Sequence, residues 1–217
     1  MGLFSRKSKE DNDAEQIGKI MTEMIKADQE GKPKKKIKLN EKLREYVEDY
    51  LYFYNRGSIL YEMAGEDKTK LDEPMECFQK AIRLNPSYTK AWYRLGYAYY
   101  ATEQDEKSIE AYEKVIELET KEGKEDFLYA SHFCNLITML EILVKRLNGD
   151  LTKWKTDEQY VSKIQEKLDT LRPIFNAVFD PKVFDTDEKI FVGCRENFIR
   201  ILTDLEPDIA RATLYSS

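Results

Sequence analysis

Long apolar segments and targeting signals are missing from this sequence of 217 residues. It contains no run of about eighteen uncharged apolar residues, so it predicts no membrane-spanning helix. The N-terminus lacks the apolar block of a secretory signal. Arg6 also stands where an acylation signal that begins at Gly2 requires Ser or Thr. We therefore expect a cytoplasmic protein that does not span a membrane.

Histidine and cysteine are too scarce for the common catalytic and metal sites. The single histidine, His132, lies in an apolar helical pattern, and no second histidine exists to share a metal with it. Cys77, Cys134 and Cys194 lie too far apart in the sequence for a CxxC metal site, so we expect buried, reduced thiols. No nucleophile, zinc-binding or phosphate-loop motif occurs. The sequence therefore predicts no enzyme activity, cofactor or metal.

Glycine and proline are also few, nine and six, while hydrophobic residues make up 41% and charged residues 35%. This balance is typical of a helical protein with a hydrated surface. The net charge is −6, divided between +3 over residues 1–40 and −9 over the remainder. Because binding to a duplex requires a basic surface, the acidic remainder argues against DNA as a partner.

The N-terminal region is predicted to consist of three segments. We expect residues 1–12 to be disordered, and residues 13–39 to form an amphipathic helix followed by a basic linker, 31–38. The helix could contact a partner, another copy or an anionic membrane surface, or it could fold back and cap the body. Its predicted apolar face consists of Ile17, Ile20, Met21, Met24 and Ile25.

Helical hairpins are predicted for the rest of the chain. Asn40 is a plausible N-cap for a long helix over 41–63, and Pro74 opens a helix that ends near Leu84. In the next helix, over 88–101, Gly96 allows close approach of a neighbour, while Trp92, Leu95 and Tyr99 recur at helical spacing. An internal repeat is present, because Glu76–Leu84 aligns with Glu110–Leu118 at an offset of 34 residues.

The spacing Trp92, Leu95-Gly96, Tyr99, followed by Ser108 and Tyr112, resembles a tetratricopeptide (TPR) repeat. Thr120 departs from the proline with which this family usually ends its second helix. The resemblance implies an all-α, right-handed solenoid of antiparallel helix pairs. We expect one helical domain over 40–206, with repeats at 47–86 and 87–120, a divergent third unit and capping helices over 125–204, and a tail over 207–217.

In this family the first helices of successive repeats line a concave groove, so the resemblance implies that tyrosines on those helices face a partner. Such rings with polar tips would suit a peptide or helix of another protein. Half of them could instead pack between helices. The candidate tyrosines are Tyr50, Tyr54 and Tyr61 in the first repeat and Tyr93, Tyr97 and Tyr100 in the second.

Lys90 and Arg94 match the lysine and arginine of the family's carboxylate clamp. Tyr54 and Ser58 occupy the positions of the other clamp residues, so half of the clamp is absent. We therefore expect Lys90 and Arg94 to pair with acidic side chains of a partner, the alternative being salt bridges along the helix surface.

The resemblance thus implies a non-catalytic adaptor or scaffold that binds another protein in a tyrosine-lined groove. Two alternatives stay open at this point. The N-terminal helix and lysine-rich segment could tether the protein to a membrane or RNA surface, or the chain could self-associate through its groove.

Overall fold

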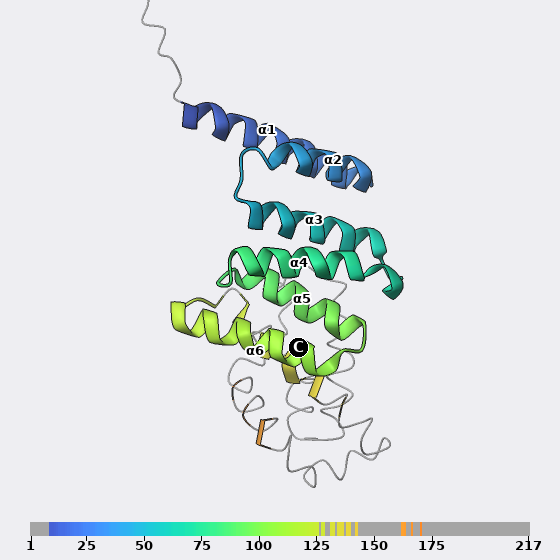
Figure 1. The fold of residues 1–217 in the computed structure, drawn as a ribbon, viewed down its shortest axis with the longest axis vertical. Helices are drawn as coiled ribbons and strands as arrows, with labels where there is room; N and C mark the ends of the chain where they lie inside the picture. Colours follow the sequence, from blue (N-terminus) through green and yellow to red (C-terminus); the bar gives the residue numbers. More distant parts are fainter. Residues whose placement is uncertain are drawn as a thin grey trace, which may run out of the picture. The chain divides into compact units, whose positions relative to one another are not determined.

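A computed structural model describes residues 9–125 and, beyond them, 127–128, 131–132, 134–136, 138–139, 142, 162–163, 166 and 170 (Figure 1). Every regular element among these residues is helical, which confirms the predicted all-α fold. The chain divides into two compact units, Met1–Ala98 and Tyr99–Ser217, here called the N-terminal and C-terminal units.

The N-terminal unit begins with a helical hairpin. Helix α1 spans Lys9–Gln29 and α2 spans Pro33–Leu43. Gly31 takes a left-handed conformation (φ 61°) in the turn between them, a conformation that glycine adopts without strain. The predicted amphipathic helix therefore folds back onto the chain that follows it. Its apolar side shares one core with α2 and α3, formed by Ile20, Met24, Ala27, Leu39, Leu43 and Ile59.

Two expectations about this region were wrong. The segment predicted as a basic linker is helical, because Pro33 opens α2 and the aliphatic residues among its lysines face the core. The single helix predicted over 41–63 is interrupted after Leu43 and resumes at Asp49. Asn40 is consequently no N-cap. It lies buried in α2, where its Nδ2 donates to the carbonyl oxygen of Tyr52 (3.1 Å).

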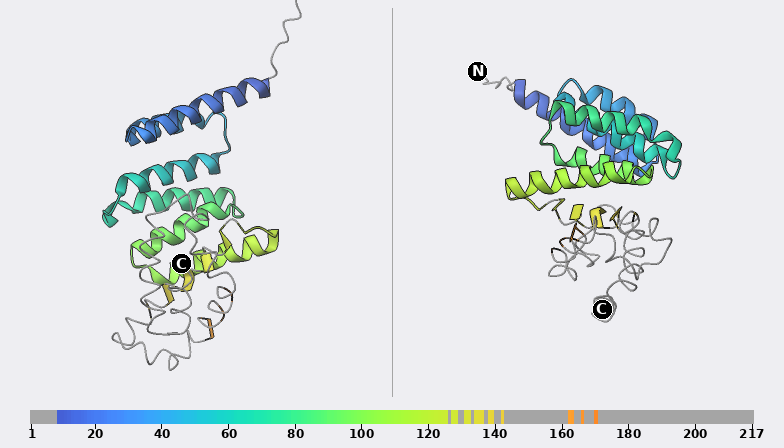
Figure 2. Two further views of the ribbon diagram at one scale, coloured as in Figure 1. Left: turned by 180° about the vertical axis from the view of Figure 1, so that it is seen from behind. Right: turned by 60° about the horizontal axis from the view of Figure 1, so that its bottom comes forward.

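Helices α3 (Asp49–Ala64) and α4 (Asp72–Leu84) form the next pair, joined through a 3₁₀ turn, η1 (Lys68–Lys70). They pack closely at Gly57, where a Cβ atom would lie 2.8 Å from Phe78 Cε1 and 3.1 Å from Cys77 Cβ. Pro74 lies in the first turn of α4, as predicted. Two further views show α1 to α4 following one another, as their contacts require (Figure 2).

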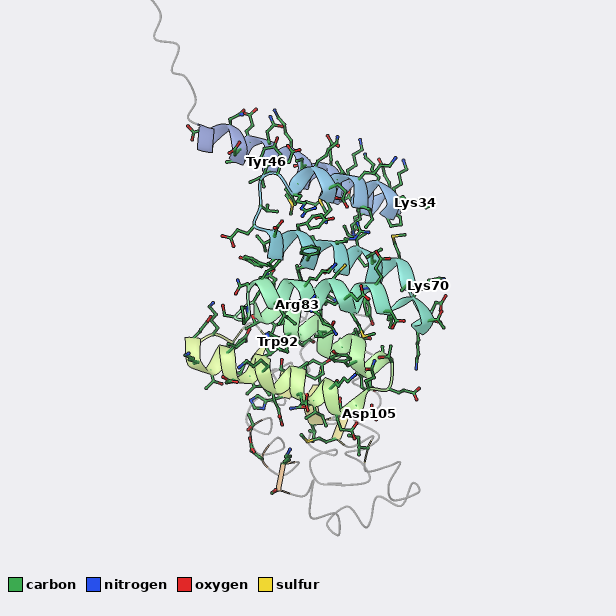
Figure 3. The ribbon with its side chains drawn as sticks, in the orientation of Figure 1. Lys34, Tyr46, Lys70, Arg83, Trp92 and Asp105 are labelled. Atoms are coloured by element: carbon green, nitrogen blue, oxygen red, sulfur yellow. The ribbon has the colours of Figure 1, made fainter. Side chains whose placement is uncertain are left out.

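Helix α5 (Thr89–Ala101) follows a short turn and carries the boundary between the two units. In this turn the backbone N–H and the hydroxyl group of Ser87 both donate to Asn85 Oδ1 (3.2 and 2.9 Å). The Trp92 indole N–H donates to the carbonyl oxygen of Pro86 (2.9 Å), which ties the turn to the helix. Figure 3 marks Trp92 on α5.

In the C-terminal unit, α6 spans Asp105–Glu122 and ends at Gly123 in a left-handed conformation (φ 65°). Asp105 is the first residue of the helix, and Gln104 is its N-cap. Ile109, Tyr112 and Val115 are buried on one side of α6. Residues 1–8, the tail and most of the predicted third unit and capping helices, 125–204, lie outside the described residues.

Candidate functional site

Three of the candidate tyrosines lie along α3 and recur at a spacing that keeps them on one side of the helix. All three, Tyr50, Tyr54 and Tyr61, are half-buried. Tyr54 approaches Phe78 of α4, with ring centroids 6.1 Å apart. Their rings therefore contribute to packing within the unit while part of each stays exposed.

The end of α3 and the middle of α5 meet through an aromatic pair. The rings of Tyr61 and Tyr97 lie edge to face, with centroids 5.7 Å apart and an interplanar angle of 60°. Burial, followed by the charge and hydrogen bond of Tyr97, raises the pKa of Tyr61, and the positive charge of Arg94 opposes this shift. The two candidate tyrosines are thus brought together, and Arg94 lies one helical turn before Tyr97 on α5.

Tyr88 packs against two of the candidate tyrosines, although the sequence analysis did not include it among the candidates. Its ring lies edge to face against Tyr50 (5.0 Å) and Tyr54 (5.1 Å), and burial is the main cause that raises its pKa. The search for tyrosines repeating along a helix overlooked it because it precedes the first turn of α5. Its position in the sequence, at the first residue of the helix predicted over 88–101 and close to a tyrosine-rich helix, was the available signal.

The remaining candidates are placed less closely together. Tyr93 and Arg94 are half-buried on α5, and Lys90 is exposed near its start. Ser58 lies on α3 with its Oγ buried and without a hydrogen-bond partner. Tyr100 belongs to the C-terminal unit.

The cysteines and the single histidine are the residues that the sequence analysis considered for catalytic and metal sites. Cys77 and Cys134 are free and buried, as predicted, and burial is the main cause that raises the pKa of the Cys77 thiol. Cys194 lies outside the described residues, and His132 is buried. In the part of the chain that the structure describes, no three His, Cys, Asp or Glu side chains gather as metal ligands.

The tether interpretation required a free apolar face on the N-terminal helix. Most of that face is covered: Ile20 and Met24 lie in the core shared with α2 and α3, and Ile17 packs against it. Met21 and Ile25 are exposed, by 43% and 58%. Among the described helices, none has the length and apolar character to cross a bilayer.

Comparisons with known proteins match the central part of the chain. One family model described as "TPR repeat" matches residues 67–103, and another, "Tetratricopeptide repeat", matches residues 89–119. The first match covers α4 and α5, and the second covers most of the α5–α6 pair.

Several known proteins match part of this chain. Small glutamine-rich tetratricopeptide repeat-containing protein 2 of Saccharomyces cerevisiae is 30% identical over 82 residues, or 38% of this chain and 22% of that protein. DnaJ homolog subfamily C member 7 of Homo sapiens is 36% identical over 74 residues, or 34% of this chain and 14% of that protein. The chain thus matches only a small part of these relatives' lengths. The crystal structure of the Sgt2 TPR domain from Aspergillus fumigatus matches with a TM-score of 0.49 and 25% identity, over 60% of this chain and 82% of that one.

Proposed function

Because this chain carries tetratricopeptide repeats over residues 67–119, we propose that it is a non-catalytic interaction module that binds a peptide or helix of another protein. The proposed binding surface is formed by tyrosines of α3 and α5, the first helices of two successive pairs. Its members are Tyr50, Tyr54, Tyr61, Tyr88, Tyr93 and Tyr97, with Ser58 between them and Lys90 and Arg94 beside them. Tyr100 belongs to the C-terminal unit and is not counted in this surface.

One observation carries the proposal. The Tyr61–Tyr97 ring pair and the neighbouring Arg94 combine aromatic area, hydroxyl groups and a positive charge on the two helices that this family uses for binding. Aromatic side chains that are already half-buried lose little rotamer freedom when a ligand packs on them. Tyrosine and arginine are also the residue types that dominate binding energy at protein interfaces.

Two kinds of contact follow from these side chains. Apolar groups of the ligand would pack on the exposed parts of the rings, while the hydroxyl groups would hydrogen-bond to its backbone. Lys90 and Arg94 would pair with ligand carboxylates, and Arg94 could do so with two parallel hydrogen bonds. A small preformed surface of this kind typically supports micromolar affinity, about −8 kcal/mol.

A random peptide library, selected on the immobilised full chain, provides the ligand for a test. We expect selected peptides to be rich in apolar and acidic residues. Their affinity for the Tyr93→Ala/Tyr97→Ala variant should fall at least about tenfold, measured by calorimetry, because truncating interface tyrosines removes buried area.

A matched control is available on the same scaffold. Phe53 is also half-buried on α3, but its ring packs edge to face against Tyr52 and lies under the ammonium group of Lys80 (5.3 Å to the ring centroid), neither of which belongs to the proposed surface. Phe53→Ala should leave peptide affinity unchanged, and circular dichroism should show equal helicity in all three proteins. Selected peptides that bind the double tyrosine variant as well as the native chain would refute the proposed surface.

A further inference from the structure

Helix α2 presents a row of lysines on the side opposite the core. Lys34, Lys38 and Lys42 recur every four residues, so they share one side of the helix about 12 Å long. All three are exposed, whereas Lys36, Leu39, Asn40 and Leu43 are buried on the other side. We call Lys34, Lys38 and Lys42 the lysine face. Figure 3 shows Lys34 at one end of the hairpin and Tyr46 at the other.

The positive charge of the lysine face is not neutralised by the described parts of the protein. Among the residues that the structure describes, its three ammonium groups make no ion pair, whereas Lys19, Lys70 and Lys114 each pair with a carboxylate. Glu41 is the only acidic residue of α2, and it accepts hydrogen bonds from Arg56 (2.8 Å) and Tyr52 (2.9 Å).

Acidic side chains near the lysine face are unevenly placed. Glu23 and Glu45 line the same shallow hollow as Lys42, at the Tyr46 end of the hairpin. At the other end Lys34 and Lys35 line the hairpin turn, where Glu30 is paired with Lys32 (2.9 Å). The positive charge is therefore most concentrated toward Lys34.

This arrangement does not serve the stability of the helix. Like charges four residues apart on a helix repel one another and destabilise it, and the lysine face contains two such pairs in sequence. The contacts that hold α2 in place come from its other side, through Leu39, Leu43 and the Asn40 hydrogen bond. Repulsion among the three lysines thus destabilises α2, and none of the contacts that hold α2 in place offsets it through these lysines. Residues that reduce local stability in this way are typical of a functional surface.

The chemistry of the lysine face identifies its partner. No aromatic side chain lies in α2, so the helix offers no stacking platform for single-stranded nucleic acid. No large apolar side chain accompanies the three lysines on this face, and lysine is depleted from stable protein interfaces. An extended anionic surface requires neither feature, because it attracts clustered lysines through charge alone.

We propose that the lysine face adsorbs the protein reversibly onto a bilayer that contains anionic lipids. This mode differs from the tether predicted from the sequence, because the apolar side of α1 stays in the core and only lysines meet the headgroups. The net charge of the chain is −6, so adsorption requires that α2 faces the bilayer. Acidic residues farther than a Debye length, about 8 Å at physiological salt, are largely screened from it.

Vesicle co-sedimentation of the full chain tests the proposal. Vesicles of phosphatidylcholine with about a third phosphatidylserine should bind the native chain, and pure phosphatidylcholine vesicles should not. In the variant Lys34→Gln/Lys38→Gln/Lys42→Gln the partition constant should fall on the order of a hundred-fold, because each lysine near an anionic bilayer contributes several-fold. Added salt should weaken the binding of the native chain.

A charge-matched control separates the lysine face from net charge. Lys68, Lys80 and Lys121 are exposed elsewhere, and changing these three to glutamine should leave vesicle binding within a few-fold of the native value. The lysine-face variant should keep its helicity and its thermal midpoint, because the substitutions remove repulsion.

Three results would overturn the proposal. One is the absence of binding to anionic vesicles, and another is an equal loss of binding in both triple variants. The third is tighter binding to a DNA duplex or a polyglutamate peptide than to the vesicles, which would assign the face to a different polyanion. The tyrosine variant Tyr93→Ala/Tyr97→Ala should bind vesicles normally, so this test does not depend on the proposed peptide surface.

Discussion

Lys36 shows at the residue scale how a charged side chain fastens this fold. Its side chain is 11% exposed, and its ammonium group donates to Asp28 of α1 (2.6 Å) and to Glu62 of α3 (2.5 Å). Burial alone would lower the pKa of Lys36, but the hydrogen bonds with Asp28 and Glu62 outweigh burial and raise it. One residue thus connects three helices while its aliphatic stem adds apolar area.

The raised pKa of Lys36 gives a pH-dependent prediction. Its stabilising effect is complete below the unfolded-state pKa of 10.5 and is lost as the pH rises through the higher folded-state value. Lys36→Met should lower the free energy of unfolding at neutral pH by about 1 kcal/mol, since both acidic partners are more than half exposed. Urea titrations should show this difference shrinking as the pH rises above 10.5.

The exposed Lys34 provides the matched control, because Lys34→Met should change stability little at any pH. Comparing each variant with the native chain at the same pH cancels the titration of the tyrosines that all three proteins share. A difference between native and Lys36→Met that stays constant across the alkaline range would refute the role assigned to the ammonium group.

At the scale of elements, two glycines in similar helices have opposite surroundings. Gly57 lies where α3 meets α4, and a Cβ atom there would come within 2.8 Å of the Phe78 ring and 3.1 Å of Cys77 Cβ. Phe78 is fully buried and cannot move aside easily. Gly18 lies in α1, and a Cβ atom there would meet nothing within 4 Å. Close packing therefore explains why a glycine occupies the position of Gly57, but it does not explain the glycine at the position of Gly18.

Alanine at each position should separate the two cases. Gly57→Ala should lower the free energy of unfolding by about 1–3 kcal/mol, because an overpacked interface costs more than the gain in helix propensity. Gly18→Ala should raise it by about 0.5–1 kcal/mol, because only the propensity gain applies. Urea unfolding followed by circular dichroism measures both. Stabilisation by Gly57→Ala would show that α3 and α4 are less tightly packed than described.

At the scale of the molecule, the proposed peptide-binding surface of tyrosines, here called the tyrosine surface, and the lysine face lie on different helices. The first is carried by α3 and α5 and the residue before α5, and the second by α2. Among the contacts described above, none joins a side chain of the lysine face to a member of the tyrosine surface. We therefore expect the proposed peptide ligand and the anionic bilayer to contact different helices of the protein.

Independence of the two surfaces is testable by combining their variants. In a chain carrying both the tyrosine pair and the lysine triple substitutions, peptide affinity and vesicle binding should each fall as in the separate variants. The coupling free energy should be below about 0.5 kcal/mol, as expected for sites without shared partners. Vesicles that change peptide affinity several-fold in the native chain would reveal coupling and contradict this expectation.

The sequence correctly predicted the features that depend on interactions between residues close together along the chain. The spacing of Trp92, Gly96 and Tyr99 and the internal repeat of 34 residues predicted the helix pairs. The observed helices α3 and α4 lie within the predicted repeat 47–86. The prediction for residues 31–43 was wrong. A run of lysines is typical of a solvated linker, and the sequence pattern did not reveal that residues between the lysines are buried.

The candidate site was partly predictable for the same reason. Helical spacing indicated which tyrosines share a side of α3 or α5, but not that Tyr88 would join them. Nor did the spacing indicate that Tyr61 would meet Tyr97, 36 residues away in the sequence.

The sequence by itself determined the helical class, the repeat period and the residue types that each helix presents, because these depend on interactions within a few residues along the chain. Only the tertiary structure decided which charges are buried and which rings touch. Lys36 reaches Glu62 across 26 residues, and its neighbour Lys34 faces solvent, although both belong to one lysine run. Burial depends on how whole helices pack, and that packing is set by the summed contacts of the unit.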